Sequence, residues 1–166
     1  MERVAIRGYR RQMRWLFGLW LLPACLLACG DKCAVSLSVE VTSASLSVQP
    51  TPFGDATLSG LFQLVLSVGP EASGSSTVSL GNFSLENAAG VAIVDVLTLP
   101  TGSAFPLVVA KGSSQQVSQP VSAESVDSAL VCPGPVRIVG SLMDSLKGGT
   151  VPVRSELITP DCPPAT

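Results

Sequence analysis

The chain has 166 residues, with ten Lys or Arg, twelve Asp or Glu and no histidine. Without histidine, nucleophile activation of the Ser-His-Asp and Cys-His kinds is excluded. From residue 29 onward five basic residues stand against eleven acidic ones, a net charge of −6, which repels phosphate backbones and disfavours nucleic-acid binding.

The N-terminal part of the chain has the layout of a secretory signal. A basic stretch over residues 3–14 precedes an uncharged apolar run, Trp15–Cys29, and this order is typical of a cleaved signal peptide. A transmembrane anchor is the alternative interpretation. It is disfavoured because about 20 apolar residues are needed to cross the hydrocarbon core and because Pro23 would break the helix. Both Met1 and Met13 stay open as translation starts, since either leaves a basic residue before the apolar run.

The end of the apolar run resembles the lipobox of bacterial lipoproteins. Leu26-Leu27-Ala28-Cys29 fits the pattern of an aliphatic residue, two small or apolar residues and then cysteine. The resemblance implies cleavage ahead of Cys29, a diacylglyceryl group on its sulfur, and attachment to a membrane of the cell envelope. Cys25 offers a rival site, in which Pro23 departs from the pattern. Two or more acyl chains anchor a protein stably without a spanning helix, since each buried methylene contributes about 0.8 kcal/mol.

From residue 35 onward hydrophobic residues alternate with polar ones, which marks half-buried strands. The alternating runs predict strands at 35–41, 44–48, 58–68, 78–85, 91–96, 105–109, 136–138 and 151–153. One-residue slips after Val41, Leu80 and Ile93 predict β-bulges. Residues 113–128, rich in Ser and Gln, are expected to form one short turn of helix or a long loop.

Many short strands separated by Gly- and Pro-containing turns predict an all-β fold, a single antiparallel sandwich of two sheets. The predicted organisation is a signal peptide over residues 1–28 in the form of a helix, a lipidated tether over 29–34 and the β-sandwich domain over 35–162. No Trp or Tyr follows residue 28, so the core of the domain must consist of aliphatic residues and four phenylalanines.

Three segments resemble the middle of an immunoglobulin-like domain of the hydin-like group: Leu85–Val91, Ser103–Leu107 and Lys111–Val117. Those domains have an Asn- and Gly-containing turn after one strand, a phenylalanine strand, and a Gly-Ser turn before the next strand. The closing strand of that family is replaced here by a cysteine-bearing segment, residues 131–162. The resemblance implies an immunoglobulin-like sandwich that binds or scaffolds rather than catalyses.

Three cysteines remain once Cys29 is lipidated: Cys33, Cys132 and Cys162. Export places them in an oxidising compartment, where disulfide formation is the default. Cys132 and Cys162 flank the last pair of predicted strands and are the preferred bridge, although Cys33 could take either partner. A zinc site lacks both a Cys-x-x-Cys pair and histidine, so no metal and no cofactor are expected.

These features together predict a lipid-anchored protein of the cell envelope, a non-catalytic binding or structural module that holds another envelope protein through its loops or a sheet edge. The alternative is a serine hydrolase that uses a pair formed by Ser145 and Lys147, whose spacing places both side chains on one face of a strand. The simpler interpretation of the same residues is a solvated turn, Lys147–Thr150, between two strands.

Overall fold

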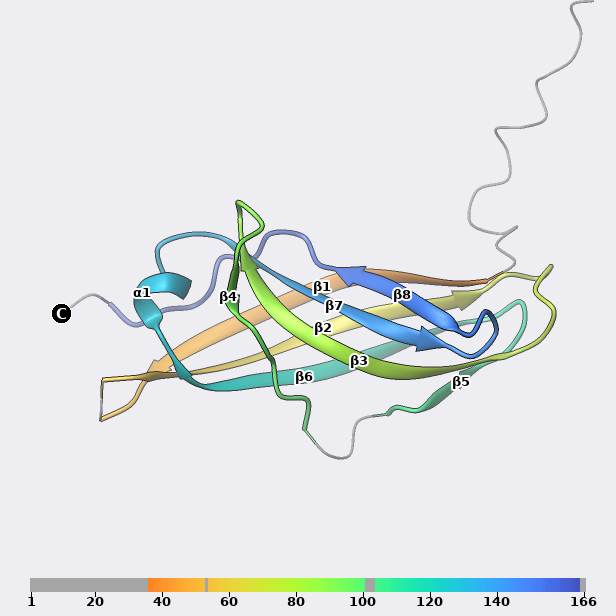
Figure 1. Ribbon diagram of the computed structural model, residues 1–166, viewed down its shortest axis with the longest axis horizontal. Helices are drawn as coiled ribbons and strands as arrows, with labels where there is room; N and C mark the ends of the chain where they lie inside the picture. The colour runs from red at the N-terminus through yellow and green to blue at the C-terminus, as the bar shows by residue number, and fades with distance from the viewer. Residues whose placement is uncertain (1–35, 53, 101–103, 165–166) are drawn as a thin grey trace, which may run out of the picture. The chain divides into compact units, whose positions relative to one another are not determined.

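The chain folds into two antiparallel sheets that pack face to face (Figure 1). The computed structural model describes residues 36–52, 54–100 and 104–164. The first sheet has the order β1-β2-β6 and comprises β1 (Leu37–Pro50), β2 (Ala56–Val68) and β6 (Ser114–Val126). The second has the order β4-β3-β7-β8, with β5 also paired to β3, and comprises β3 (Ser76–Asn87), β4 (Ala92–Val94), β5 (Leu107–Val109), β7 (Val136–Asp144) and β8 (Gly149–Arg154).

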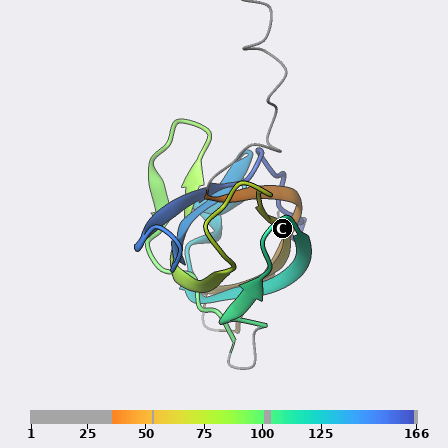
Figure 2. The same ribbon diagram turned by 90° about the vertical axis from the view of Figure 1, so that its right-hand side faces the viewer.

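The strand order is that of an immunoglobulin-like sandwich. Strands β1, β2 and β6 take the places of strands A, B and E, and β3, β7 and β8 take those of C, F and G. Strand β4 lies beside β3, as strand C′ lies beside C, and the β3–β4 hairpin projects from the body (Figure 2). The all-β sandwich predicted from the sequence is therefore confirmed, whereas the signal helix and the tether lie outside the described residues.

Two phenylalanines connect the sheets at the centre of the core. Phe62 on β2 and Phe83 on β3 are both almost fully buried, and their ring centroids lie 5.3 Å apart. Antibody domains fill this region with a tryptophan on strand C that packs on a disulfide between strands B and F. Here Phe83 occupies strand C, and Gly140 on the neighbouring β7 makes room for its ring.

The three predicted bulges are present. The β1–β2 register shifts between Val41 and Ser43, the β3–β7 register shifts between Leu80 and Phe83, and Ile93 is the extra residue where β4 pairs with β3. Each slip in the alternation returns the following hydrophobic side chains to the core face.

A fourth irregularity was not foreseen from the sequence. Where β2 pairs with β6, Ala56 and Leu58 face Val126 and Ala123, so β6 contains one residue more than β2. Ser125 lies in this bulge with a φ of 54°, in the left-handed region that few non-glycine residues adopt. The insertion is marked in the sequence only by the step from Ala123 to Val126, two core residues that lie three positions apart.

The prediction of a helical turn or loop over residues 113–128 was wrong. The segment forms β6, a 13-residue strand that pairs with β2 along its length. Val117, Val121 and Ala123 point into the core, and Gln119 occupies the core-facing position between them with no exposed surface. A glutamine at an inward position breaks the alternation of hydrophobic residues. The only helix of the described chain, α1 (Ser128–Val131), follows this strand.

Gln119 is a polar residue that is buried in the hydrophobic core. Its Nε2 donates to the carbonyl of Pro120 at 3.0 Å, while its Oε1 has no hydrogen-bond partner among the described residues. A buried polar atom without a partner costs about 1–3 kcal/mol. We expect Gln119→Met, which keeps the volume and removes the unpaired oxygen, to raise the free energy of unfolding by about 1 kcal/mol. Urea unfolding with an unchanged m value measures this, and a loss of stability would contradict it.

One side of the sandwich is closed by the segment between β4 and β5. The amide of Leu97 donates to the carbonyl of Phe83 on β3, at 2.8 Å. The next residue, Thr98, pairs with Ser122 on β6 through two backbone hydrogen bonds of 2.7 and 3.0 Å. The segment therefore connects the edges of both sheets.

The opposite side is closed by the segment after β8. Ile158 pairs with Val136 at the start of β7 through hydrogen bonds of 2.7 and 2.8 Å. Three residues later Asp161 donates to the carbonyl of Leu46 and accepts from the amide of Val48, at 2.9 and 2.8 Å. This contact covers the second half of β1 only. Between Leu37 and Ala44 no described strand pairs with the outer edge of β1.

Candidate functional site

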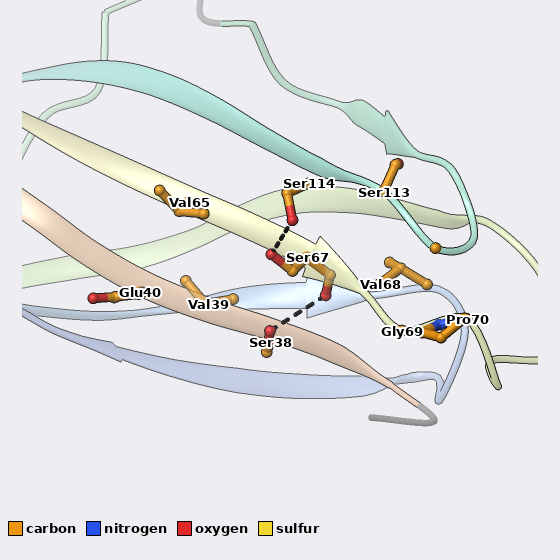
Figure 3. Close-up of a pocket in the computed structure, with 11 residues that line it drawn as sticks. Ser38, Val39, Glu40, Val65, Ser67, Val68, Gly69, Pro70, Ser113 and Ser114 are labelled. Carbon is orange, nitrogen blue, oxygen red and sulfur yellow. Dashed lines mark hydrogen bonds between the residues drawn. The ribbon is translucent and has the colours of Figure 1, made fainter. Parts of the chain in front are cut away.

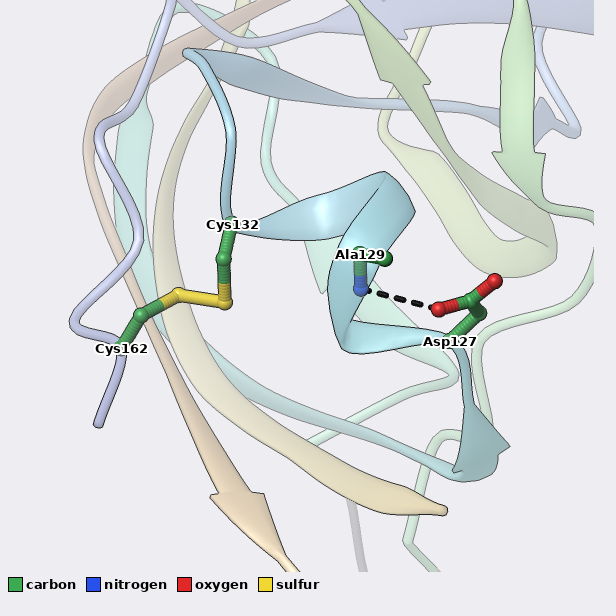
Figure 4. Close-up of a disulfide and its surroundings, with 4 residues drawn as sticks. All are labelled: Asp127, Ala129, Cys132 and Cys162. Carbon is green, nitrogen blue, oxygen red and sulfur yellow. Dashed lines mark hydrogen bonds between the residues drawn. A yellow bond between two sulfur atoms is a disulfide. The ribbon is translucent and has the colours of Figure 1, made fainter. Parts of the chain in front are cut away.

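The disulfide lies where the C-terminal segment meets the rest of the domain. Asp127 caps α1 by accepting a hydrogen bond from the amide of Ala129 at 2.9 Å (Figure 4). Cys132 follows the helix directly and is bonded to Cys162, as the sequence favoured. Because Cys162 follows Asp161, the bridge holds the C-terminal segment against β1. Cys33, the other candidate, and Cys29 lie outside the described residues.

The structure places Ser145 and Lys147 in the turn between β7 and β8, where Gly148 adopts a φ of 63°. The Ser145 hydroxyl oxygen accepts a hydrogen bond from the amide of Thr77 at 2.7 Å, and Lys147 is exposed. This agrees with the interpretation as a solvated turn. The two residues lie in a turn, so the placement on one face of a strand that their spacing suggested is not present.

Asp144, at the end of β7, is a buried carboxylate that organises the same turn. It is 2% exposed, and its Oδ1 accepts from the amide of Leu146 at 2.9 Å and from the hydroxyl of buried Ser76. Its hydrogen bonds connect the start of β3 to the β7–β8 turn. Nothing in the sequence distinguished Asp144 from the exposed acids, because burial of a carboxylate depends on the packing around it.

A serine-lined groove runs across the outer face of the three-stranded sheet near the start of β1 (Figure 3). Ser38, Ser67 and Ser114 lie side by side on β1, β2 and β6. The Ser38 hydroxyl donates to the carbonyl of Ser67 at 3.4 Å, and the hydroxyls of Ser67 and Ser114 are 2.6 Å apart. The groove has a volume of about 670 Å³ and carries one carboxylate, Glu40. Such a lining offers hydrogen bonds rather than an activated nucleophile.

A second groove lies along the other flank of the same strand. It has a volume of about 510 Å³ and is lined by residues 39–42 of β1 and by Val153, Arg154 and Glu156 of β8 and the segment after it. Val39 and Glu40 belong to both grooves. The first half of β1 is therefore flanked by two grooves, and no described strand pairs with its outer edge.

In the ranges that the structure describes, no three Cys, Asp or Glu side chains lie close enough together to hold a metal ion. No helix among the described residues is long and apolar enough to cross a membrane.

The fold defines this chain as a β-sandwich domain of immunoglobulin-like topology in which no described strand pairs with the outer edge of β1 from Leu37 to Ala44. It matches no protein-family model and no curated protein, so the hydin-like resemblance stays a prediction. Among solved structures, it is similar to the X-ray structure of Northeast Structural Genomics Consortium target SoR45, with a TM-score of 0.43 and 12% sequence identity over 74% of this chain and 83% of that chain. The similarity is distant.

Proposed function

We propose that this protein is a lipid-anchored component of the bacterial cell envelope that acts as a non-catalytic binding or structural module. The observation that carries the proposal is the motif Leu26-Leu27-Ala28-Cys29 at the end of an apolar run, directly ahead of a folded β domain. The acylated Cys29 holds the domain at a membrane surface, and the domain presents its loops and its open strand edge to another envelope protein.

Two features of the fold support this proposal. The Cys132–Cys162 bridge suits an oxidising compartment outside the cytoplasm, where structural disulfides persist. The turn at Asn87–Gly90 and the turn at Gly112–Ser113 precede β4 and β6, in the order that hydin-like domains use. We therefore include a distant relationship to immunoglobulin-like domains of that group in the proposal.

Substitution of Cys29 by alanine tests the anchor. In cells fed labelled palmitate, the unsubstituted chain is expected to take up the label, and Cys29→Ala is expected to lose both the label and the cleavage of its leader. Cys25→Ala is the matched control and should keep both. Intact-mass measurement of the membrane-extracted protein should give a chain that begins at Cys29 and carries acyl groups. A mass that begins at an initiator methionine with no fatty acid would overturn the proposal.

The binding role has a separate test in intact cells. A photo-crosslinking residue at Thr42, an exposed position on β1, is expected to capture a specific envelope protein. The same crosslinker at Glu124, an exposed position on β6, serves as the control. Capture from neither position would count against the binding role and would leave the anchor untouched.

A further inference from the structure

The first half of β1 presents a regular row of backbone donors and acceptors toward the outside. Core-facing residues of one strand all direct their N–H and C=O groups to the same side. In the second half of β1 these groups point away from β2, as the backbone hydrogen bonds of Leu46 and Val48 to Asp161 show. The core-facing residues of the first half are Leu37, Val39 and Val41, and the bulge after Val41 preserves their direction. Their backbone groups therefore point outward.

The other strand that lines the second groove is poorly suited to pairing. The amide of Ser155 donates to the carbonyl of Ile138 on β7, so Arg154 and Pro152 take the positions that point away from β7. Proline has no N–H, and at an edge position it blocks the addition of a further strand. The β8 edge is protected in this way, whereas the β1 edge carries no proline between Leu37 and Gln49.

The side chains that line the second groove indicate which kind of peptide strand could bind there. Val39, Val41 and Val153 supply an apolar floor. Glu40 and Glu156 line the same groove, and neither forms an ion pair within the described part of the chain. Arg154 is occupied by its ion pair with Glu86, at 3.0 Å. The groove thus combines an apolar base with uncompensated negative charge.

We propose that the edge of β1 from Leu37 to Val41 binds an extended segment of a partner protein in which apolar and basic side chains alternate. The segment adds a strand to the three-stranded sheet through main-chain hydrogen bonds. Its apolar side chains pack on the valines of the floor, and its Lys or Arg side chains lie beside Glu40 and Glu156. This inference deepens the proposed binding role and depends on it.

The test uses the full-length chain in detergent and a ten-residue synthetic peptide in which valine alternates with lysine, with fluorescence anisotropy as the readout. We expect saturable binding that weakens at least tenfold in Glu40→Lys/Glu156→Lys. The matched control, Glu124→Lys, introduces the same kind of charge change at the far end of β6 and should bind within twofold of the unsubstituted chain. A peptide alternating serine with lysine has the same charge and should bind at least tenfold more weakly.

Val39→Pro removes one outward N–H and one valine of the groove floor, and Val39→Ala, which removes the same side chain but keeps the N–H, separates the strand pairing from the packing. Proline is tolerated at outward positions of edge strands, so the thermal midpoint should remain within a few degrees while peptide binding falls at least fivefold. If Val39→Pro binds no more weakly than Val39→Ala, or if Glu124→Lys weakens binding as much as the groove variant, the edge assignment is overturned. Capture of a partner at Thr42 in cells would then leave the general binding role standing, so the two proposals fail separately.

Discussion

Replacing Cys132 and Cys162 by serine is expected to lower the free energy of unfolding by about 3 to 4 kcal/mol. The bridge joins residues 30 positions apart and encloses β7 and β8. Its loss returns conformational entropy to the unfolded chain. Guanidinium unfolding of the full chain measures the change. Either single serine variant, kept reduced, should lose the same amount as the double variant, since each removes the one bond. A change below about 1 kcal/mol would contradict the prediction.

The same substitution has an expected local effect. Cys162 adjoins Asp161, whose backbone bonds cover the second half of the β1 edge. Without the bridge this segment should open by itself, which exposes the amide of Val48 to solvent. Hydrogen exchange at Val48 is expected to accelerate more than exchange at Val68, whose amide donates to Ser113 at the other end of the sheet. Equal acceleration at both amides would show that the bridge affects only global stability.

Phe83→Ala is expected to cost about 3 to 5 kcal/mol of stability. The ring is 1% exposed and touches the ring of Phe62 on the other sheet, so its removal leaves a cavity at the centre of the core. Phe105→Ala is the control, because Phe105 is only partly buried against the core and should cost less. Thermal and denaturant unfolding of both variants tests the ranking. Equal losses would argue against the central position of Phe83.

A double-mutant cycle tests whether the cost of a side chain at position 140 comes from its contact with the Phe83 ring. A Cβ on Gly140 would lie 2.6 Å from Cγ of Phe83 and 2.7 Å from the carbonyl oxygen of Asn82. Gly140→Ala alone should therefore cost about 1 to 3 kcal/mol through overpacking. In the Phe83→Ala background the cost should shrink, with a coupling of at least about 1 kcal/mol. Additive losses would show that the backbone contact with Asn82 sets the cost.

The strands that were predicted correctly are those in which Val, Leu, Ile and Phe alternate with other residues, apart from single-residue slips. The period of two is a local property of the pleated backbone, so β1, β2 and β3 could be found from the residues alone, and their bulges from the slips. Strand β6 was missed because Gln119 stands at a core position. Burial of a glutamine there depends on the packing of β2 and the second sheet around it, which no local pattern contains.

The features of the candidate site also divide into those that could be predicted from the sequence and those that could not. The bridge between Cys132 and Cys162 could be favoured from the sequence because two cysteines flank two strands. The open half of the β1 edge could not be located, since an edge is defined by which strands are absent beside it. That depends on where residues 95–99 and 158–162 cross between the sheets.

The sequence by itself determined that this chain builds a mostly aliphatic two-sheet domain after an apolar N-terminal run, because alternation and composition act residue by residue. Only the tertiary structure decided which strand edge has no neighbouring strand among the described residues. The contact between Asp161 and Leu46 joins positions more than a hundred residues apart, and the pairing of such distant segments is selected by the packing of the whole domain. Within the part of the chain that the structure describes, the same packing leaves the outer edge of Leu37 to Val41 without a strand partner, beside two carboxylates, Glu40 and Glu156, that form no ion pair there.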